Sequence, residues 1–100
     1  MSGYAPSTER SVRTKRRPRV KPPRLFRVLL HNDHYTTMDF VVQILQAVFH
    51  KGRSDAVRIM LNVHHSGVGV CGIYPFEIAE TKVAEVHKLA AANGFPLKCS

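Results

Sequence analysis

The chain has 100 residues, a formal net charge of +8, and two cysteines, Cys71 and Cys99. This length admits one small domain, and two cysteines are too few for a disulfide scaffold, so we expect a reducing, cytoplasmic compartment. No apolar run approaches the roughly 20 residues of a membrane span, and no stretch has the pattern of a secretory signal.

The basic charge gathers in residues 1–24. These residues carry eight of the 15 Lys and Arg side chains against Glu9 alone, a net charge of +7, whereas residues 25–100 carry seven basic and six acidic residues. With four prolines and almost no large apolar side chain, the segment cannot bury enough surface to offset the entropy of ordering. We therefore expect a disordered basic extension at 1–24 and one folded domain at 25–100. A transit peptide is the alternative, although the prolines would break its amphipathic helix.

The first predicted element is a strand at residues 25–30, because the apolar run there is too short for a helix. Apolar residues then recur at spacings of three and four, which predicts a helix capped by Thr36 and Thr37 and ending near Gly52. The same spacing after Ser54, a second capping residue, predicts another helix.

Glycines mark the limits of the remaining elements. Gly67 ends the second helix after about His65, and Gly94 occupies the expected position of a left-handed C-cap. Three further elements are predicted: an irregular strand at 68–74, a helix at 76–93 and a closing strand at 95–99. The order βααβαβ indicates an α+β fold, with three helices packed on a small three-stranded antiparallel sheet.

Histidines and cysteines suggest two kinds of chemistry. His31 and His34 lie three residues apart at a strand end, where side chains alternate in direction, and neither cysteine has a close partner. We therefore expect no metal site and no cofactor.

Cys71, His64 and Asp33 form a conceivable nucleophilic set, but no local signature of a nucleophile accompanies them. A cysteine between glycines in a strand is typical of a small buried hydrophobe. We expect a binding protein rather than an enzyme.

The polar side chains after the first strand suit a cationic ligand. Asn32, Asp33 and a neutral His64 all offer acceptors that together can hold an ammonium group. Four apolar side chains are expected around them: Met38, Met60, Val63 and Leu97. Methionine adapts to varied hydrophobic guests, so this set predicts a ligand with an ammonium group at one end and an apolar group at the other. Taken singly, Met60 and Val63 are more often core residues, and Asn32 with Asp33 is more often a turn.

Three segments together carry a family resemblance: "LLHNDHYTTMDFV", "AVRIMLNVHHSGVGVCGIYPFEIAETKV" and "AAANGFPLKC". In this order and spacing they resemble the ClpS adaptor family of bacteria and plastids, over essentially all of residues 25–100. The resemblance implies an adaptor that binds proteins bearing a destabilising N-terminal residue and delivers them to a ClpA-type AAA+ unfoldase of the Clp protease. The resemblance also implies that the protein catalyses no reaction of its own. A monomer is the natural expectation for a delivery module.

The resemblance also implies roles for individual residues. It assigns the α-ammonium group of the substrate to Asn32, Asp33 and His64. The pocket for the first side chain, typically Leu, Phe, Tyr or Trp, is assigned to Thr36, Met38, Val41, Met60, Val63 and Leu97. Met38 acts in this assignment as a gate.

A third set of residues concerns the unfoldase. Glu77 and Lys82 match the docking surface of the family, and Glu80 is a nearby candidate. Without the resemblance, these three charges would indicate only a solvated helix face. The basic extension fits as well, because adaptors of the family carry an extension that engages the unfoldase during delivery.

One position departs from the family pattern. His34 stands where a second acidic residue is usual, and the loss of a carboxylate weakens the attraction for a cationic ligand. Since an unperturbed imidazole gains a proton near about pH 6.5, and a protonated His64 no longer accepts, we expect binding to weaken from about pH 8 to about pH 6. The departure also leaves open an altered choice of first residue, as in a specialised second copy of the adaptor.

The alternative function is a small nucleic-acid or ribosome-associated module that acts through the basic extension. Such a module would show steep salt dependence, because phosphate contacts release counterions. The nearly neutral charge of residues 25–100 and their lack of an aromatic stacking platform favour the adaptor, with no nucleic acid and no membrane as partners.

Overall fold

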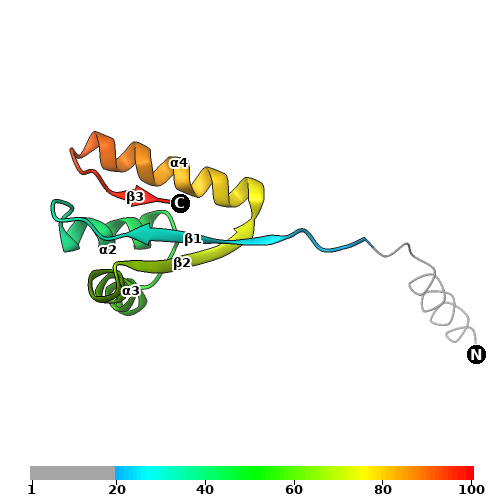
Figure 1. Cartoon of the computed structure of the whole chain (residues 1–100), viewed down its shortest axis with the longest axis horizontal. Helices are drawn as coiled ribbons and strands as arrows, with labels where there is room; N and C mark the ends of the chain where they lie inside the picture. The colour runs from blue at the N-terminus through cyan, green and yellow to red at the C-terminus, as the bar shows by residue number, and fades with distance from the viewer. Residues whose placement is uncertain (1–19) are drawn as a thin grey trace, which may run out of the picture.

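A computed structural model describes residues 20–100 (Figure 1). Its elements are β1 (Leu25–His31), α2 (Met38–Ala47), α3 (Arg53–Ser66), β2 (Val68–Pro75), α4 (Phe76–Ala92) and β3 (Lys98–Cys99). This order confirms the predicted βααβαβ fold of the α+β class. Most of the expected disordered extension lies outside the described residues, and its last part, residues 20–24, contains no helix or strand. Within residues 20–100, no helix combines the length and apolar character needed to cross a membrane.

The sheet has the order β2-β1-β3, and both pairings are antiparallel. β1 pairs with β2 along its whole length, but the register shifts between Val28 and Leu29, so that Cys71 is an extra residue on β2. This bulge is the irregular backbone that the glycines predicted. β3 pairs with β1 only at Leu30 and His31, immediately before the loop that carries Asn32.

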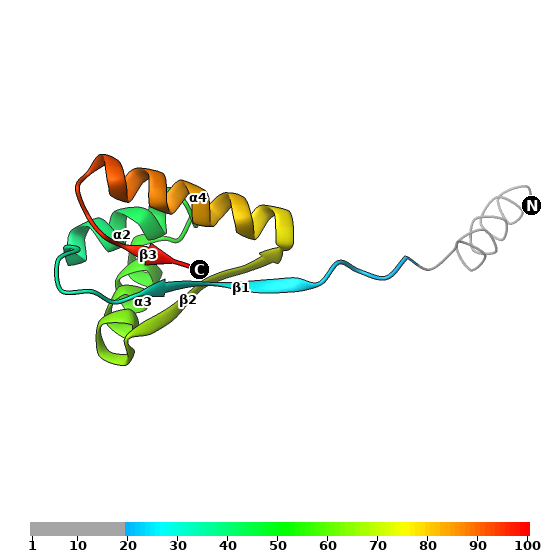
Figure 2. The ribbon, with the colours of Figure 1, turned by 45° about the horizontal axis from the view of Figure 1, so that its top comes forward.

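The core lies between one face of the sheet and the three helices. The sheet contributes the buried residues Val28, Leu30, Cys71 and Cys99. The helices contribute apolar residues at helical spacing, among them Phe40, Ile44, Leu45, Ile59, Val63 and Val86. In Figures 1 and 2, α4 runs along β1 and β3, while residues 20–24 lead away from the domain.

The first helix begins as predicted and ends earlier. Thr37 is its N-cap, and its hydroxyl oxygen accepts a hydrogen bond from the amide of Phe40 at 3.2 Å. The prediction that this helix reaches Gly52 is wrong, because the chain leaves the helix after Ala47 and His50 adopts a positive φ of 55°. Apolar periodicity suggested a longer helix because Val48 and Phe49 are also buried, although they lie in the turn.

The second helix begins at Arg53, so the predicted cap at Ser54 is wrong. Gly52 is the N-cap, with no side-chain hydrogen bond, and Ser54 lies inside the helix. Gly67 ends the helix as predicted, with a left-handed φ of 86°.

The C-terminal end of the domain has less strand than predicted. Gly94 adopts a φ of 75°, which confirms the left-handed cap, but β3 contains only Lys98 and Cys99 instead of residues 95–99. The preceding residues pack in the core. The centre of the Phe95 ring lies 4.8 Å from that of the Phe40 ring, and Leu97 is buried.

Candidate functional site

The loop that follows β1 is built around the side chain of Asp33. Its Oδ1 accepts hydrogen bonds from the amides of Tyr35 at 2.8 Å and Thr36 at 2.7 Å, and its Oδ2 accepts one from the Thr36 hydroxyl at 2.6 Å. Aspartate suits this position because its short side chain reaches the backbone two and three residues further along. The loop therefore enters α2 in a defined conformation.

The same contacts set the charge of Asp33. Partial burial raises the pKa of this carboxyl group, but hydrogen bonds from Thr36 and Tyr35 and the nearby His34 outweigh burial and lower the pKa below its ordinary value. The group is therefore ionised at neutral pH. A carboxylate offers about four acceptor sites, of which the turn uses three, so Asp33 keeps its charge and one free site.

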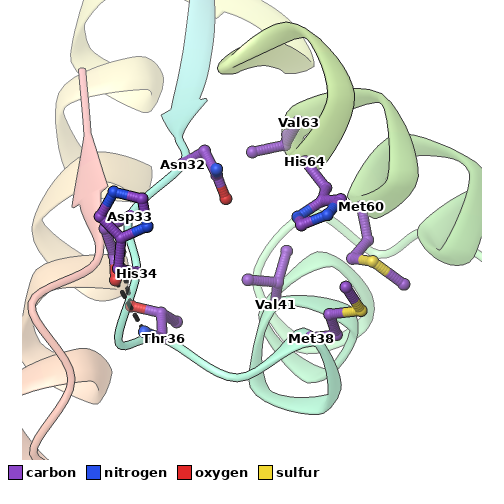
Figure 3. Close-up of a pocket in the computed structure, with 9 residues that line it drawn as sticks. All are labelled: Asn32, Asp33, His34, Thr36, Met38, Val41, Met60, Val63 and His64. Carbon is purple, nitrogen blue, oxygen red and sulfur yellow. Dashed lines mark hydrogen bonds between the residues drawn. The ribbon is translucent and has the colours of Figure 1, made fainter.

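Backbone contacts bring α3 beside this loop. The amide of Asn32 donates to the carbonyl oxygen of Gly67 at 2.9 Å, which joins the end of β1 to the end of α3. Gly69 allows a close approach of β2 to the helix, because a Cβ atom there would lie 2.7 Å from a methyl carbon of Val63. As a result, His64 and Asn32 face the same hollow (Figure 3).

The hollow is a cavity of about 260 Å³. It is lined by Asn32, Asp33, His34, Thr36, Met38, Val41, Met60, Val63 and His64. Figure 3 shows the polar residues of the loop on one side and the side chains from α2 and α3 on the other. This arrangement joins hydrogen-bond acceptors and one carboxylate to an apolar wall.

The apolar wall has an inner part with few side-chain rotamers and an edge with flexible side chains. Val41 and Val63 are buried, whereas Met60 is half-buried and Met38, the first residue of α2, is 47% exposed. Branched residues have few rotamers, while methionine has three flexible bonds and adapts to different guests. The cavity can therefore accept apolar groups of more than one shape.

The cavity unites most of the residues that were assigned to the site from the sequence. Eight of the nine binding residues line it, and His34 joins them. Leu97 does not line it; this residue is 4% exposed and packs in the core close to β3. Its apolar character and its position near the chain end gave no indication of which way it packs.

Cys71 lies outside the cavity, so the conceivable nucleophilic set with His64 and Asp33 is not assembled. It is 1% exposed, and burial raises the pKa of its thiol to about 12 with a further contribution from Cys99. A thiol in that state is a poor nucleophile. In the part of the chain that the structure describes, no three His, Cys, Asp or Glu side chains gather as metal ligands.

The three charges assigned to unfoldase docking lie on α4. Glu77, in the first turn, and Glu80 are exposed. Lys82 is half-buried, and its ammonium group donates to the carbonyl oxygen of Val48 at 2.6 Å and lies 5.7 Å from the centre of the Tyr74 ring. Lys82 thus satisfies a carbonyl group at the end of α2, a role for which no local sequence signal exists.

The family model described as "ATP-dependent Clp protease adaptor protein ClpS" matches residues 21–100. Relatives named ATP-dependent Clp protease adapter protein ClpS include one from Syntrophus aciditrophicus, 61% identical over 82% of this chain and 77% of its own length. Another, from Caulobacter vibrioides strain NA1000 / CB15N, is 53% identical over 90% of this chain and 83% of its own. A similar solved structure is Agrobacterium tumefaciens ClpS2 bound to L-phenylalaninamide, with a TM-score of 0.76 and 38% identity, covering 79% of this chain and 95% of that chain.

Proposed function

The chain belongs to the ClpS family of ATP-dependent Clp protease adaptor proteins, and we propose that it recognises N-degron substrates by their free α-amine and bulky hydrophobic first residue. In this proposal it acts as a monomer in the cytoplasm and delivers the bound substrate to a ClpA-type AAA+ unfoldase. The adaptor itself supplies binding, and the protease supplies the chemistry.

The observation that carries this proposal is the division of the cavity into a polar side and an apolar side. An ammonium group has three donors, and the polar side, together with His64 on α3 across the cavity, offers three acceptor groups: the amide oxygen of Asn32, the carboxylate of Asp33 and a ring nitrogen of His64. All three hydrogen bonds are charge-assisted, because the ammonium donor is ionised, and the ionised Asp33 makes one of them a contact between opposite charges. A free N-terminus therefore matches this side in both charge and hydrogen bonding.

The apolar side supports selection of the first side chain. Val41 and Val63 form a buried surface on which a Leu, Phe, Tyr or Trp side chain can lie, with Met38 and Met60 at the edge. The related ClpS2 structure holds L-phenylalaninamide, a molecule that joins a free amine to an aromatic side chain. The amine and the first side chain of a substrate have the same relationship.

The test is fluorescence anisotropy of labelled peptides that differ only in residue one: Leu, Phe, Tyr, Trp, Ile or Gly. Each peptide is measured with a free and with an acetylated amine. We expect binding only for the free-amine peptides with Leu, Phe, Tyr or Trp, because acetylation removes the charge and two of the three donors. Equal binding of acetylated peptides would contradict the proposal, as would binding that depends on residues 1–24 and falls steeply with salt.

A pair of adjacent histidines supplies a matched control. His64 lines the cavity, whereas the neighbouring His65 is exposed outside it. We expect His64→Ala to weaken binding of a free-amine Phe peptide about tenfold, the effect of losing one hydrogen bond to a charged group. His65→Ala removes the same type of side chain from the same helix and should leave the affinity unchanged.

Delivery has a separate test. Glu77→Lys and Glu80→Lys reverse exposed charges of α4 at the proposed docking surface, and Glu85→Lys reverses one further along the same helix. We expect the first two to weaken binding to a purified ClpA-type unfoldase more than the third, while all three retain peptide binding. Equal effects of the three variants would show that docking depends on overall charge instead of this surface.

A further inference from the structure

The sheet has a second face, opposite the core. Because cross-strand partners point to the same side, the register places Arg27 beside Ile73, Leu29 beside Val70, and His31 beside Val68 on this face. Five aliphatic side chains lie on it: Leu25, Leu29, Val68, Val70 and Ile73. Four of them are between 38% and 62% exposed. We call this surface the open sheet face.

The composition of the open sheet face is unusual for a surface in contact with water. An antiparallel sheet with one solvated side normally carries polar residues there. Here β1 and β2 instead present mainly apolar residues to both sides. A contiguous exposed apolar surface of this kind marks an interaction site more often than isolated exposed side chains do.

The charged side chains on the strands of this sheet are all basic. Arg27 lies within it, Lys98 lies next to it on β3, and Lys21 and Arg24 are exposed where the chain enters β1. No acidic residue lies on β1, β2 or β3. The acidic residues between positions 20 and 100 are Asp33, Asp39, Asp55, Glu77, Glu80 and Glu85, all in helices or in the loop after β1. A partner for this face therefore needs apolar side chains bordered by carboxylates.

We propose that the open sheet face docks an acidic amphipathic helix of a partner protein. A sheet buries an apolar face against a second layer, and a helix with one apolar stripe supplies such a layer. Carboxylates beside the stripe would meet Arg27 and Lys98, and the basic residues 1–24 would add attraction at a distance. This site is distinct from the cavity, so it does not depend on the proposed recognition of N-termini.

The other possible occupants fit less well. A second copy, packed face to face about a two-fold axis, would bring further copies of Arg27 and Lys98 onto a surface that has no acidic residue. Residues 1–24 have a net charge of +7 and face the same repulsion. A membrane surface is usually anchored by an amphipathic helix with Trp, Phe or Leu, whereas this face is a sheet whose side chains are mostly short and branched.

The experiment uses the full ¹⁵N-labelled chain and three probes. The first is a synthetic amphipathic helix with leucine along one stripe and glutamate elsewhere, and the second has lysine in place of every glutamate. The third is a phosphatidylcholine vesicle that contains phosphatidylglycerol. We expect the glutamate peptide alone to bind, with its amide shift changes concentrated at residues 25–31 and 68–75.

Two double variants locate the site. Val70→Ser with Ile73→Ser removes apolar surface, and we expect the affinity for the glutamate peptide to fall about tenfold. Leu61→Ser is the matched control, since Leu61 is 42% exposed on α3 and Val70 is 41% exposed on β2. Arg27→Glu with Lys98→Glu should transfer binding to the lysine peptide, and retained binding of L-phenylalaninamide by each variant shows that the domain is still folded.

Three results would overturn the inference. Equal binding of the two peptides would remove the role of charge, and shift changes centred on the cavity or on α4 would place the site elsewhere. Binding to the anionic vesicles without binding to the glutamate peptide would identify a membrane surface as the occupant. Failure of L-phenylalaninamide to bind the wild-type chain would instead contradict the proposed recognition of N-termini and leave this site standing.

Discussion

Lys82 on α4 donates a hydrogen bond to the carbonyl oxygen of Val48, at the end of α2, over 2.6 Å. The two residues are 34 positions apart in the chain, so the contact joins separate parts of the fold. α4 carries the proposed docking residues Glu77 and Glu80, and α2 carries part of the cavity wall. Lys82 therefore has a structural role in addition to any role in binding an unfoldase.

Replacement of Lys82 by methionine should lower the stability of the domain. The substitution keeps an apolar stem of similar length but leaves the carbonyl group of Val48 without its partner, which costs about 1–2 kcal/mol when the group is partly shielded from water. Urea denaturation followed by circular dichroism measures the change. Lys88→Met, at an exposed position of the same helix, is the control, and equal midpoints for the two variants would contradict the structural role.

Asp33→Asn separates the charge of the site from its shape. The asparagine side-chain oxygen can still accept from the amides of Tyr35 and Thr36, so the turn should persist, but the negative charge beside the bound amine is lost. We expect the affinity for a free-amine Phe peptide to fall about tenfold or more, because a contact between a carboxylate and an ammonium group becomes a hydrogen bond to a neutral acceptor. Asp39→Asn, at an exposed position in the first turn of α2, should change the affinity little.

The lowered pKa of Asp33 also predicts how stability depends on pH. A carboxyl group with a lower pKa in the folded state stabilises the fold at pH values above its unfolded value of 3.8, and this contribution is lost as pH falls through the folded value. Urea midpoints of the wild type and of Asp33→Asn, measured between about pH 7 and pH 2, should therefore converge at the acid end. A difference that stays constant over this range would mean that the charge of Asp33 does not contribute to stability.

The two cysteines should be inert in the folded protein. Burial raises the pKa of Cys71 to about 12 and that of Cys99 to about 11, so almost no thiolate is present at pH 8. We expect alkylation by iodoacetamide at pH 8 to be slower in the native protein than in urea, by about 1,000-fold at Cys71 and about 100-fold at Cys99, because the thiolate fraction falls about tenfold for each unit of pKa. Rapid labelling of either cysteine in the native state would show that its thiol is exposed or ionised.

The parts of the fold that depend on local chemistry were predictable from the sequence. The cap at Thr37 and the left-handed glycines Gly67 and Gly94 rest on hydrogen bonds and backbone preferences within a few residues. The early end of α2 was missed because Val48 continues the apolar pattern while it packs from a turn. An apolar pattern predicts which residues are buried, but it does not by itself predict whether their backbone is helical or forms a turn.

Sequence patterns predicted the candidate site to a similar extent. The polar residues from Asn32 to His34 and the apolar residues of α2 and α3 could be identified from residue type and from the family resemblance. The direction of Leu97 and the contact of Lys82 depend on how distant segments pack, so no neighbouring residue indicated them. Tertiary packing also decides that the sheet keeps an apolar open face, because the sequence of each strand is equally compatible with burial on both sides.

His34 offers a final prediction, since it lines the cavity beside Asp33, and the family resemblance led us to expect an acidic residue at this position. His34→Asp should raise the affinity for free-amine peptides a few-fold at low salt, because a second negative charge near a bound ammonium contributes about 1 kcal/mol in a partly solvated site. His50→Asp makes the same change in charge in the turn after α2, where His50 is exposed outside the cavity. Peptides with Leu, Phe, Tyr, Trp and Ile as residue one, compared between wild type and His34→Asp, then report selectivity. An equal gain for all peptides would show that position 34 affects only the binding of the amine. A gain that differs among the first residues would show that position 34 also affects their selection. No gain would mean that a charge at position 34 does not affect the bound ligand.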